Sequence, residues 1–306
     1  MNECEPDRRA FVKSVTLGMP LLAHSLGSVA EPARPVEPAR RGPLKISCNL
    51  YSFNEPLTRK SMTLDDVLTF CSDVGFDAVD PTGYYFPGYP AVPPDSYIYA
   101  LKRKAFRLGL DISGTGVRND FSLADAIHRR EEIALVKAWI DVAAKLDAPI
   151  LRIFSGLRVQ PELMREEVTE YMLEAIDECV AYGAQRGVML GLQNHADFIE
   201  TADHMLELLN RINSDWFAAN LDIGSFRTGD PYAQIVQVAP QAATWQIKEK
   251  LFVNGKETET DLSRIMQIVR QSGYRGYLPI ETLGKGDPRQ KVPLFYEKVR
   301  TALLAS

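Results

Sequence analysis

Short apolar runs alternate with longer amphipathic segments along the chain, from Leu44 to its end. The short runs are rich in β-branched and other apolar residues, which is typical of buried strands. The longer segments repeat their apolar positions with a helical period. Eight runs are predicted to be strands: residues 45–51, 78–81, 111–115, 150–154, 188–194, 217–222, 243–248 and 276–281.

Helix boundaries can be predicted from capping residues. Three helices are expected to begin at side chains that cap an N-terminus: Thr63, Thr201 and Asp261. Two long helices are expected over residues 124–146 and 164–185. Four helices are expected to end at a glycine that turns the chain toward the next strand: Gly75, Gly109, Gly187 and Gly273.

Regular alternation of strand and helix indicates an α/β fold with a parallel sheet. Eight such units within residues 44–306 match a single (β/α)8 TIM barrel better than an open, doubly wound sheet. No Gly-x-Gly-x-x-Gly motif opens a helix after the first predicted strand, so a dinucleotide-binding fold is not supported.

The N-terminus resembles an export signal. Arg8 and Arg9 form a twin-arginine pair, and a weakly apolar stretch over residues 14–30 follows and ends in small residues. Residues 1–30 are therefore predicted to be a twin-arginine signal segment, and residues 31–43, rich in Pro, Ala and Arg, a linker to the barrel. We expect a periplasmic protein without stable membrane insertion, because no later run approaches about 18 apolar residues.

Composition narrows the choice of partners. The chain has 35 basic and 40 acidic residues, a formal charge of −5, and no basic stripe, so nucleic acid is not expected as a partner. Its four cysteines are far apart, which suggests neither a zinc site nor a dense disulfide framework. Cys71 and Cys179 are interpreted as small apolar residues on helices. Whether the chain forms a homo-oligomer stays open.

Polar residues end the last four predicted strands of the barrel. In this fold the working side chains lie at the C-terminal strand ends and in the loops that follow. The fifth to eighth strands end at these candidate residues: Gln193 and His195, then Asp222, then Gln246 and Lys248, then Glu281.

From about Leu44 onward the chain resembles the xylose isomerase-like TIM-barrel superfamily, the sugar phosphate isomerase/epimerase group. The resemblance implies a divalent metal held by one side chain from each of these strands, which here are Gln193, Asp222, Gln246 and Glu281. Two carboxylates and two amides make a hard oxygen site of formal charge −2, suited to Mn²⁺ or Mg²⁺. The alternatives are a buried salt bridge for Asp222 and Glu281, and direct binding of a sugar hydroxyl by the two amides.

Gln193 departs from the glutamate that is common at the fifth-strand position of the family. A glutamine cannot take up a proton, so Glu281 is left as the candidate base. His195, two residues further on, is the candidate for a second proton-transfer group, with a structural histidine as the alternative. Lys248 could steer a carbonyl or enolate oxygen, or pair with a nearby carboxylate.

The earlier strands offer a rim for substrate binding. An aromatic segment that includes Tyr84, Tyr85 and Phe86 follows Asp80 at the end of the second strand. Aromatic faces stack on the apolar faces of sugar rings, so this segment is expected to form a wall for a small-molecule carbohydrate, although a structural loop is nearly as plausible. Asp80 itself and Arg152, on the fourth strand, are further candidates for substrate binding.

Three functions are consistent with these residues. The first is a metal-dependent sugar isomerase or epimerase that transfers a proton next to a sugar carbonyl through an enolate. The second is a lyase or hydratase acting on 3-keto sugars or keto-glycosides, which needs only one base and suits an exported protein, since sugar phosphates are scarce outside the cell. The third is a sugar-binding protein without catalysis.

The export signal gives a direct test. A twin-arginine pair is read by a receptor rather than through charge alone. Replacing Arg8 and Arg9 together by Lys should therefore leave the precursor in the cytoplasm, as measured by cell fractionation and immunoblotting. Undiminished export of the double-lysine variant would refute the signal.

Overall fold

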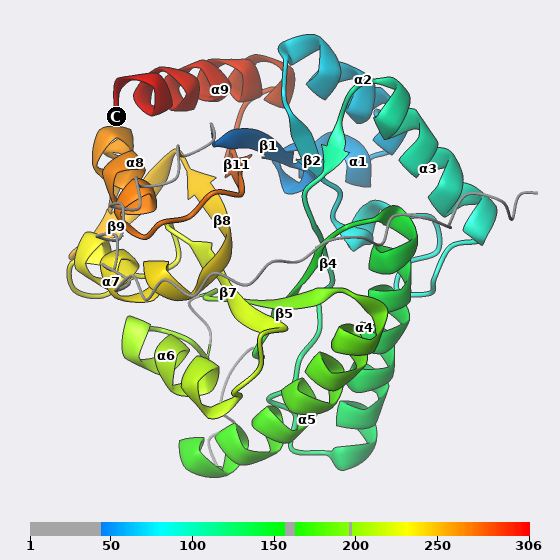
Figure 1. Cartoon of the computed structure of the whole chain (residues 1–306), viewed down its shortest axis with the longest axis vertical. Coiled ribbons are helices and arrows are strands. Elements are labelled where there is room, and N and C mark those ends of the chain that lie inside the picture. The colour runs from blue at the N-terminus through cyan, green and yellow to red at the C-terminus, as the bar shows by residue number, and fades with distance from the viewer. Residues whose placement is uncertain (1–43, 157–162, 196–197) are drawn as a thin grey trace, which may run out of the picture. The chain divides into compact units, whose positions relative to one another are not determined.

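The computed structural model describes residues 44–156, 163–195 and 198–306. The predicted signal segment and linker, residues 1–43, lie outside the described residues. Within the described part, helices surround a central set of parallel strands (Figure 1), so the predicted TIM-barrel fold is confirmed.

The barrel wall is a parallel sheet in the order β3-β2-β1-β11-β8-β7-β6-β5-β4. Its strands are β1 (Lys45–Asn49), β2 (Ala78–Asp80), β3 (Asp111–Ile112), β4 (Thr115–Gly116), β5 (Ile150–Phe154), β6 (Met189–Gln193), β7 (Phe217–Asp222), β8 (Ala242–Lys248) and β11 (Tyr277–Glu281). These nine strands fill eight positions, because β3 and β4 are two halves of one barrel strand interrupted at Ser113 and Gly114.

The interrupted third strand closes the barrel. β3 pairs with β2 on one side, and β4 pairs with β5 on the other. A further parallel bridge joins Thr82 to Gly116, and the Thr115 hydroxyl donates to the Pro81 carbonyl at 2.7 Å. The two ends of the sheet are thereby joined.

The three predicted N-caps, Thr63, Thr201 and Asp261, each precede a helix as expected. The helices are α1 (Asn54–Thr58), α2 (Leu64–Val74), α3 (Asp95–Arg107), α4 (Ala126–Leu146), α5 (Arg165–Arg186), α6 (Ala202–Arg211), α7 (Pro231–Val238), α8 (Leu262–Gln271) and α9 (Pro288–Ala305). Short 3-10 turns lie at η1 (Leu50–Phe53), η2 (Gly83–Tyr85) and η3 (Ala239–Gln241). At α2, Thr63 and Asp66 form a reciprocal capping box, and Gly75 ends the helix at φ 98°.

Apolar side chains fill the space between the strands and the helical ring. Trp139 of α4 and Trp245 of β8 are the bulkiest fully buried side chains, and both belong to the core cluster. Cys71 and Cys179 are buried on α2 and α5, as predicted. Among the described residues, no helix has the length and apolar character needed to cross a bilayer.

A β-hairpin that was not expected from the sequence follows β8. Strands β9 (Lys250–Val253) and β10 (Lys256–Glu259) pair antiparallel and lie outside the barrel sheet. Asn254 and Gly255 form the turn with φ values of 51° and 75°, the left-handed conformation that a two-residue hairpin turn requires. An Asn-Gly pair between two short runs was the sequence signal for this hairpin.

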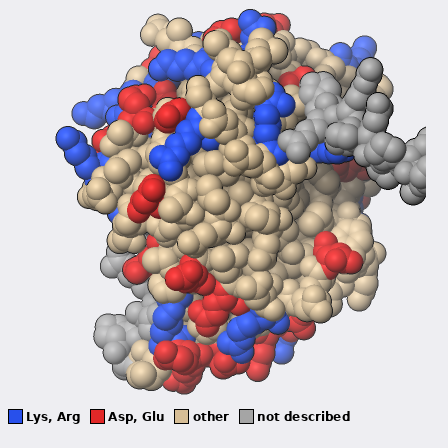
Figure 2. All heavy atoms as spheres, turned by 60° about the vertical axis from the view of Figure 1, so that its left-hand side comes forward, with Lys and Arg blue, Asp and Glu red and all other residues tan. Residues whose placement is uncertain are grey.

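One face of the molecule carries charges of both signs around an uncharged centre. Figure 2 shows basic and acidic side chains interspersed along the upper and lower parts of that face, with uncharged residues between them. Surface ion pairs of the described residues, such as Arg211 with Glu170 at 2.8 Å, likewise bring opposite charges together. No field of a single sign therefore dominates the face.

Close packing of α5 on β6 predicts the effect of a small substitution. A Cβ at Gly183 would lie 2.5 Å from Leu190 Cδ2 and 2.6 Å from the Val188 carbonyl oxygen. Gly183→Ala should therefore destabilise the fold by about 1–3 kcal/mol through overpacking, although alanine is the better helix former by about 1 kcal/mol. Urea unfolding measures the change, with Ala181→Gly, exposed on the same helix, as the propensity control. A stabilised Gly183→Ala variant would contradict the packing.

Candidate active site

A cavity of about 790 Å³ opens at the C-terminal ends of the barrel strands. Its size is within the range of small-molecule sites. The last residues of five strands line it: Asn49 of β1, Phe154 of β5, Gln193 of β6, Lys248 of β8 and Glu281 of β11. The cavity therefore lies where TIM barrels carry their chemistry.

The register of strand pairing places the polar residues of neighbouring strands side by side at the barrel mouth. Gln193 pairs with Asn220, Asp222 pairs with Gln246, and Lys248 pairs with Glu281. Because side chains alternate along a strand, Gln246 and Lys248 point to the same side of β8. The last four barrel strands thus bring their predicted site residues together.

The Asp222 carboxylate is fully buried and surrounded by donors. Its Oδ1 accepts from the Gly224 backbone N–H at 2.9 Å. Its Oδ2 accepts from Gln193 Nε2 at 2.8 Å and from Lys248 Nζ at 2.8 Å. Asn194 also holds the backbone of Asp222, through one hydrogen bond to its N–H and one to its carbonyl.

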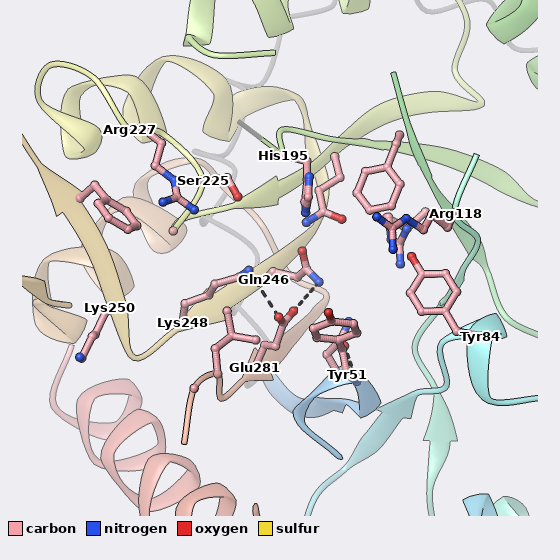
Figure 3. A pocket seen from close by; sticks show the side chains of 18 of the residues that line it. Tyr51, Tyr84, Arg118, His195, Ser225, Arg227, Gln246, Lys248, Lys250 and Glu281 are labelled. Atoms are coloured by element: carbon pink, nitrogen blue, oxygen red, sulfur yellow. Dashed lines mark hydrogen bonds and ion pairs between the residues drawn. The ribbon is translucent and has the colours of Figure 1, made fainter. Parts of the chain in front are cut away.

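The Glu281 carboxylate lies beside the same lysine (Figure 3). Its Oε2 accepts from Gln246 Nε2 at 2.8 Å, and its Oε1 lies 3.4 Å from Lys248 Nζ. Burial raises the pKa of Glu281, as does the neighbouring Asp222 carboxylate, whereas Lys248 counteracts the rise. A glutamate with a raised pKa is suited to taking up and returning a proton near neutral pH.

Lys248 therefore bridges the two carboxylates. Burial by itself lowers the pKa of the Lys248 ammonium, but Asp222 and Glu281 outweigh that effect, so the pKa lies above its ordinary value. Gly224 leaves space for the lysine stem, since a Cβ there would lie 2.9 Å from Lys248 Cδ. Of the two alternatives for Lys248, pairing with a carboxylate is the one observed.

These residues do not fit a divalent ion in the arrangement observed. The amide nitrogens of Gln193 and Gln246, rather than their oxygens, face the two carboxylates. The Lys248 ammonium lies between the carboxylates, where an ion would have to bind. Within the described ranges, no cluster of three or more His, Cys, Asp or Glu side chains is placed to hold a metal.

His195, Arg152 and Tyr84 also line the cavity. His195 follows the end of β6, and its ring packs edge-on against Phe154 at a centroid distance of 4.7 Å. Arg152 is buried and donates to the Val117 carbonyl, and its guanidinium stacks on Phe154 at 4.3 Å. Tyr84 lies beside Arg152, so one wall of the cavity is both aromatic and basic.

Three predicted substrate-binding residues do not line the cavity. Phe86 is buried in the core, edge-on to Trp139 at 5.4 Å. The Tyr85 hydroxyl donates to Asn54 Oδ1 at 2.9 Å. Asp80 is buried and accepts from Asn49 Nδ2 at 3.1 Å. The aromatic segment thus provides one wall residue, Tyr84, because Tyr85 is held by Asn54 and Phe86 packs on Trp139.

The hairpin supplies a wall that the sequence analysis missed. Lys250, Phe252 and Glu257 of β9 and β10 line the cavity. The Arg227 guanidinium stacks on the Phe252 ring at 3.9 Å, which connects the loop after β7 to the hairpin. Tyr51, just after β1, was also missed, because its position at a strand end was the only signal for it.

The sequence identifies the family to which the chain belongs. Residues 68–297, most of the chain, match the family described as xylose isomerase-like TIM barrel. The chain therefore belongs to the xylose isomerase-like TIM-barrel family. A comparison with curated proteins finds no match.

Solved structures with the same fold include two epimerases. D-psicose 3-epimerase from Clostridium cellulolyticum H10 has a TM-score of 0.71 and 15% identity, covering 85% of this chain and 99% of its own. The 3-keto-D-glucoside 4-epimerase from E. coli has a TM-score of 0.69 and 12% identity, covering 84% and 99%. A xylose isomerase-like TIM barrel protein from Mycobacterium smegmatis, solved in complex with magnesium, has a TM-score of 0.63 and 19% identity, covering 85% and 98%. At these identities the likeness is one of fold.

The raised pKa of buried Asp80 predicts that the stability of the fold depends on pH. Burial raises the pKa of this carboxyl from 3.8 to about 6, against the opposing effects of Arg152 and Asn49. Between those values the folded state binds more protons than the unfolded state, so stability from this group is lost as the pH rises. Relative to wild type, Asp80→Asn should gain about 3 kcal/mol in unfolding free energy between about pH 3 and pH 7. Urea unfolding of both proteins across this pH range measures the gain. If the unfolding free energies of wild type and Asp80→Asn changed in parallel with pH, the prediction would be contradicted.

Proposed function

We propose that this protein is an enzyme that transfers a proton at the carbon next to the carbonyl of a sugar or keto-sugar. The observation that carries the proposal is the position of Glu281, a buried carboxylate that lines the cavity, 3.4 Å from the Lys248 ammonium. A base beside a fixed positive charge is what enolate formation requires.

The proposed step uses two groups of this chain. The Glu281 carboxylate takes the proton from the carbon next to the carbonyl, and the C–H electron pair becomes the new C=C bond. The carbonyl π pair moves onto oxygen, where the Lys248 ammonium stabilises the enolate charge. If Glu281 returns the proton, the result is exchange with solvent. If His195 delivers a proton from another direction, the result is inversion.

The walls of the cavity suit a carbohydrate. Tyr51, Tyr84 and Phe252 offer aromatic surfaces for the apolar faces of a sugar ring. Arg118, which is exposed, offers hydrogen-bond donors to its hydroxyls. The names of the two epimerases with this fold support a ketose or a keto-glycoside as the substrate class.

Elimination from a keto-sugar is the second candidate, and Gln193 favours it. With an amide at the fifth-strand position, only one carboxylate of the usual glutamate pair is present to move a proton. In elimination, Glu281 removes the proton, and the enolate then expels the substituent on the β-carbon as the C–O bond breaks. His195 would protonate the leaving oxygen. The proposed export to the periplasm also points to free sugars or glycosides rather than sugar phosphates.

Deuterium exchange tests the shared first step. The wild-type protein, incubated in D₂O with a methyl 3-keto-glucoside, should exchange the proton next to the carbonyl, as followed by NMR. Glu281→Gln should slow the exchange by about 10²- to 10⁴-fold, because the amide cannot accept the proton. Glu297→Gln, exposed on α9, is the matched control, and circular dichroism checks that both variants fold.

The same assay separates the candidate functions. If elimination is the reaction, His195→Ala should retain exchange but lose release of the β-substituent, since only release needs a second acid. Sugar binding by the wild-type protein without any exchange would reject the enzyme and leave a sugar-binding protein.

A further inference from the structure

We propose that the Lys248 ammonium is the resident cation of this site, in the place between Asp222 and Glu281 where a divalent ion would otherwise bind, so that the protein works without a metal ion. The part of this inference that concerns turnover rests on the proposed function. The part that concerns metal binding does not.

The charges of the site support this assignment. Asp222 and Glu281 have exposed side-chain fractions of 0% and 4%, so each needs a compensating positive charge. Lys248 Nζ lies 2.8 Å from one carboxylate and 3.4 Å from the other, and its side chain is only 12% exposed. A divalent ion placed between the same oxygens would lie against this ammonium and be repelled by it.

Each oxygen of the two carboxylates already faces a donor of the protein. Asp222 Oδ2 accepts from both Gln193 and Lys248, and its Oδ1 accepts from the Gly224 backbone. Glu281 Oε2 accepts from Gln246, and its Oε1 faces Lys248. Each of the four oxygens therefore has an N–H group of the protein beside it.

The amide orientation is part of the same network. Asn220 Nδ2 lies 3.4 Å from Gln246 Oε1, so the oxygen end of that amide has its own donor while the nitrogen end serves Glu281. Turning Gln246 to present its oxygen to an ion would direct a nitrogen at the Asn220 donor. A single reorientation would therefore break two contacts.

The backbone makes room for the lysine. At Gly224 a Cβ would lie 2.9 Å from Lys248 Cδ and 3.0 Å from the Lys250 carbonyl oxygen. Because Gly224 also donates its N–H to Asp222, the same residue holds the carboxylate and admits the stem of its partner. The site is thus shaped for a side-chain cation.

Calorimetric titration with MnCl₂ tests the metal-binding part. After treatment with a chelator and its removal, the wild-type protein should show no stoichiometric binding. Lys248→Met removes the ammonium, leaves two unneutralised carboxylates, and should gain stoichiometric Mn²⁺ binding. Lys298→Met removes one charge from the exposed face of α9, away from the cavity, and should not change Mn²⁺ binding.

Every outcome of the titration decides the inference. Stoichiometric Mn²⁺ binding by the wild-type protein overturns the inference. A folded Lys248→Met variant that gains no Mn²⁺ binding overturns it as well. If Lys248→Met does not fold by itself, refolding of the same variant with MnCl₂ present takes its place: Mn²⁺ should restore the fold, as followed by circular dichroism, and failure to do so would overturn the inference. Deuterium exchange that is lost in chelator and restored by Mn²⁺ would also overturn the inference, whereas no exchange under any condition would reject only the proposed reaction.

Discussion

The arrangement at the barrel mouth depends on one constraint: two carboxylates share a buried site and cannot both be charged there without a positive partner. Lys248 supplies that partner, 2.8 Å from Asp222 and 3.4 Å from Glu281. The orientation of Gln193 and Gln246 follows, because each amide turns its nitrogen to a carboxylate. The absence of a side chain at Gly224 follows as well, since the lysine stem needs that space.

The fold itself could be predicted well from the sequence, because hydrophobic periodicity and capping residues are local signals. All eight predicted strand positions are occupied, although residues 111–115 are split into β3 and β4 at Ser113 and Gly114. The prediction that polar strand ends converge also holds, since a parallel barrel directs all its C-terminal strand ends to one mouth. The hairpin was missed although Asn254 and Gly255 are typical of its turn, because β10 is exposed and carries no apolar pattern.

Side-chain roles in the site were less predictable, because they depend on contacts between distant strands. The family resemblance suggested four metal ligands, whereas in the structure their amide nitrogens and the Lys248 ammonium satisfy the carboxylates. Sequence position could not separate Tyr84, at the cavity, from Phe86 in the core. The same barrel can therefore support different chemistry once a few residues at the strand ends change.

The most direct test of this account is a crystal structure of the full-length protein grown with MnCl₂, with anomalous data collected at the manganese edge. The account predicts the Lys248 ammonium within hydrogen-bonding distance of the Asp222 carboxylate, and no anomalous peak between Asp222 and Glu281. An anomalous peak there, about 2–2.5 Å from both carboxylates and with Lys248 displaced, would contradict it.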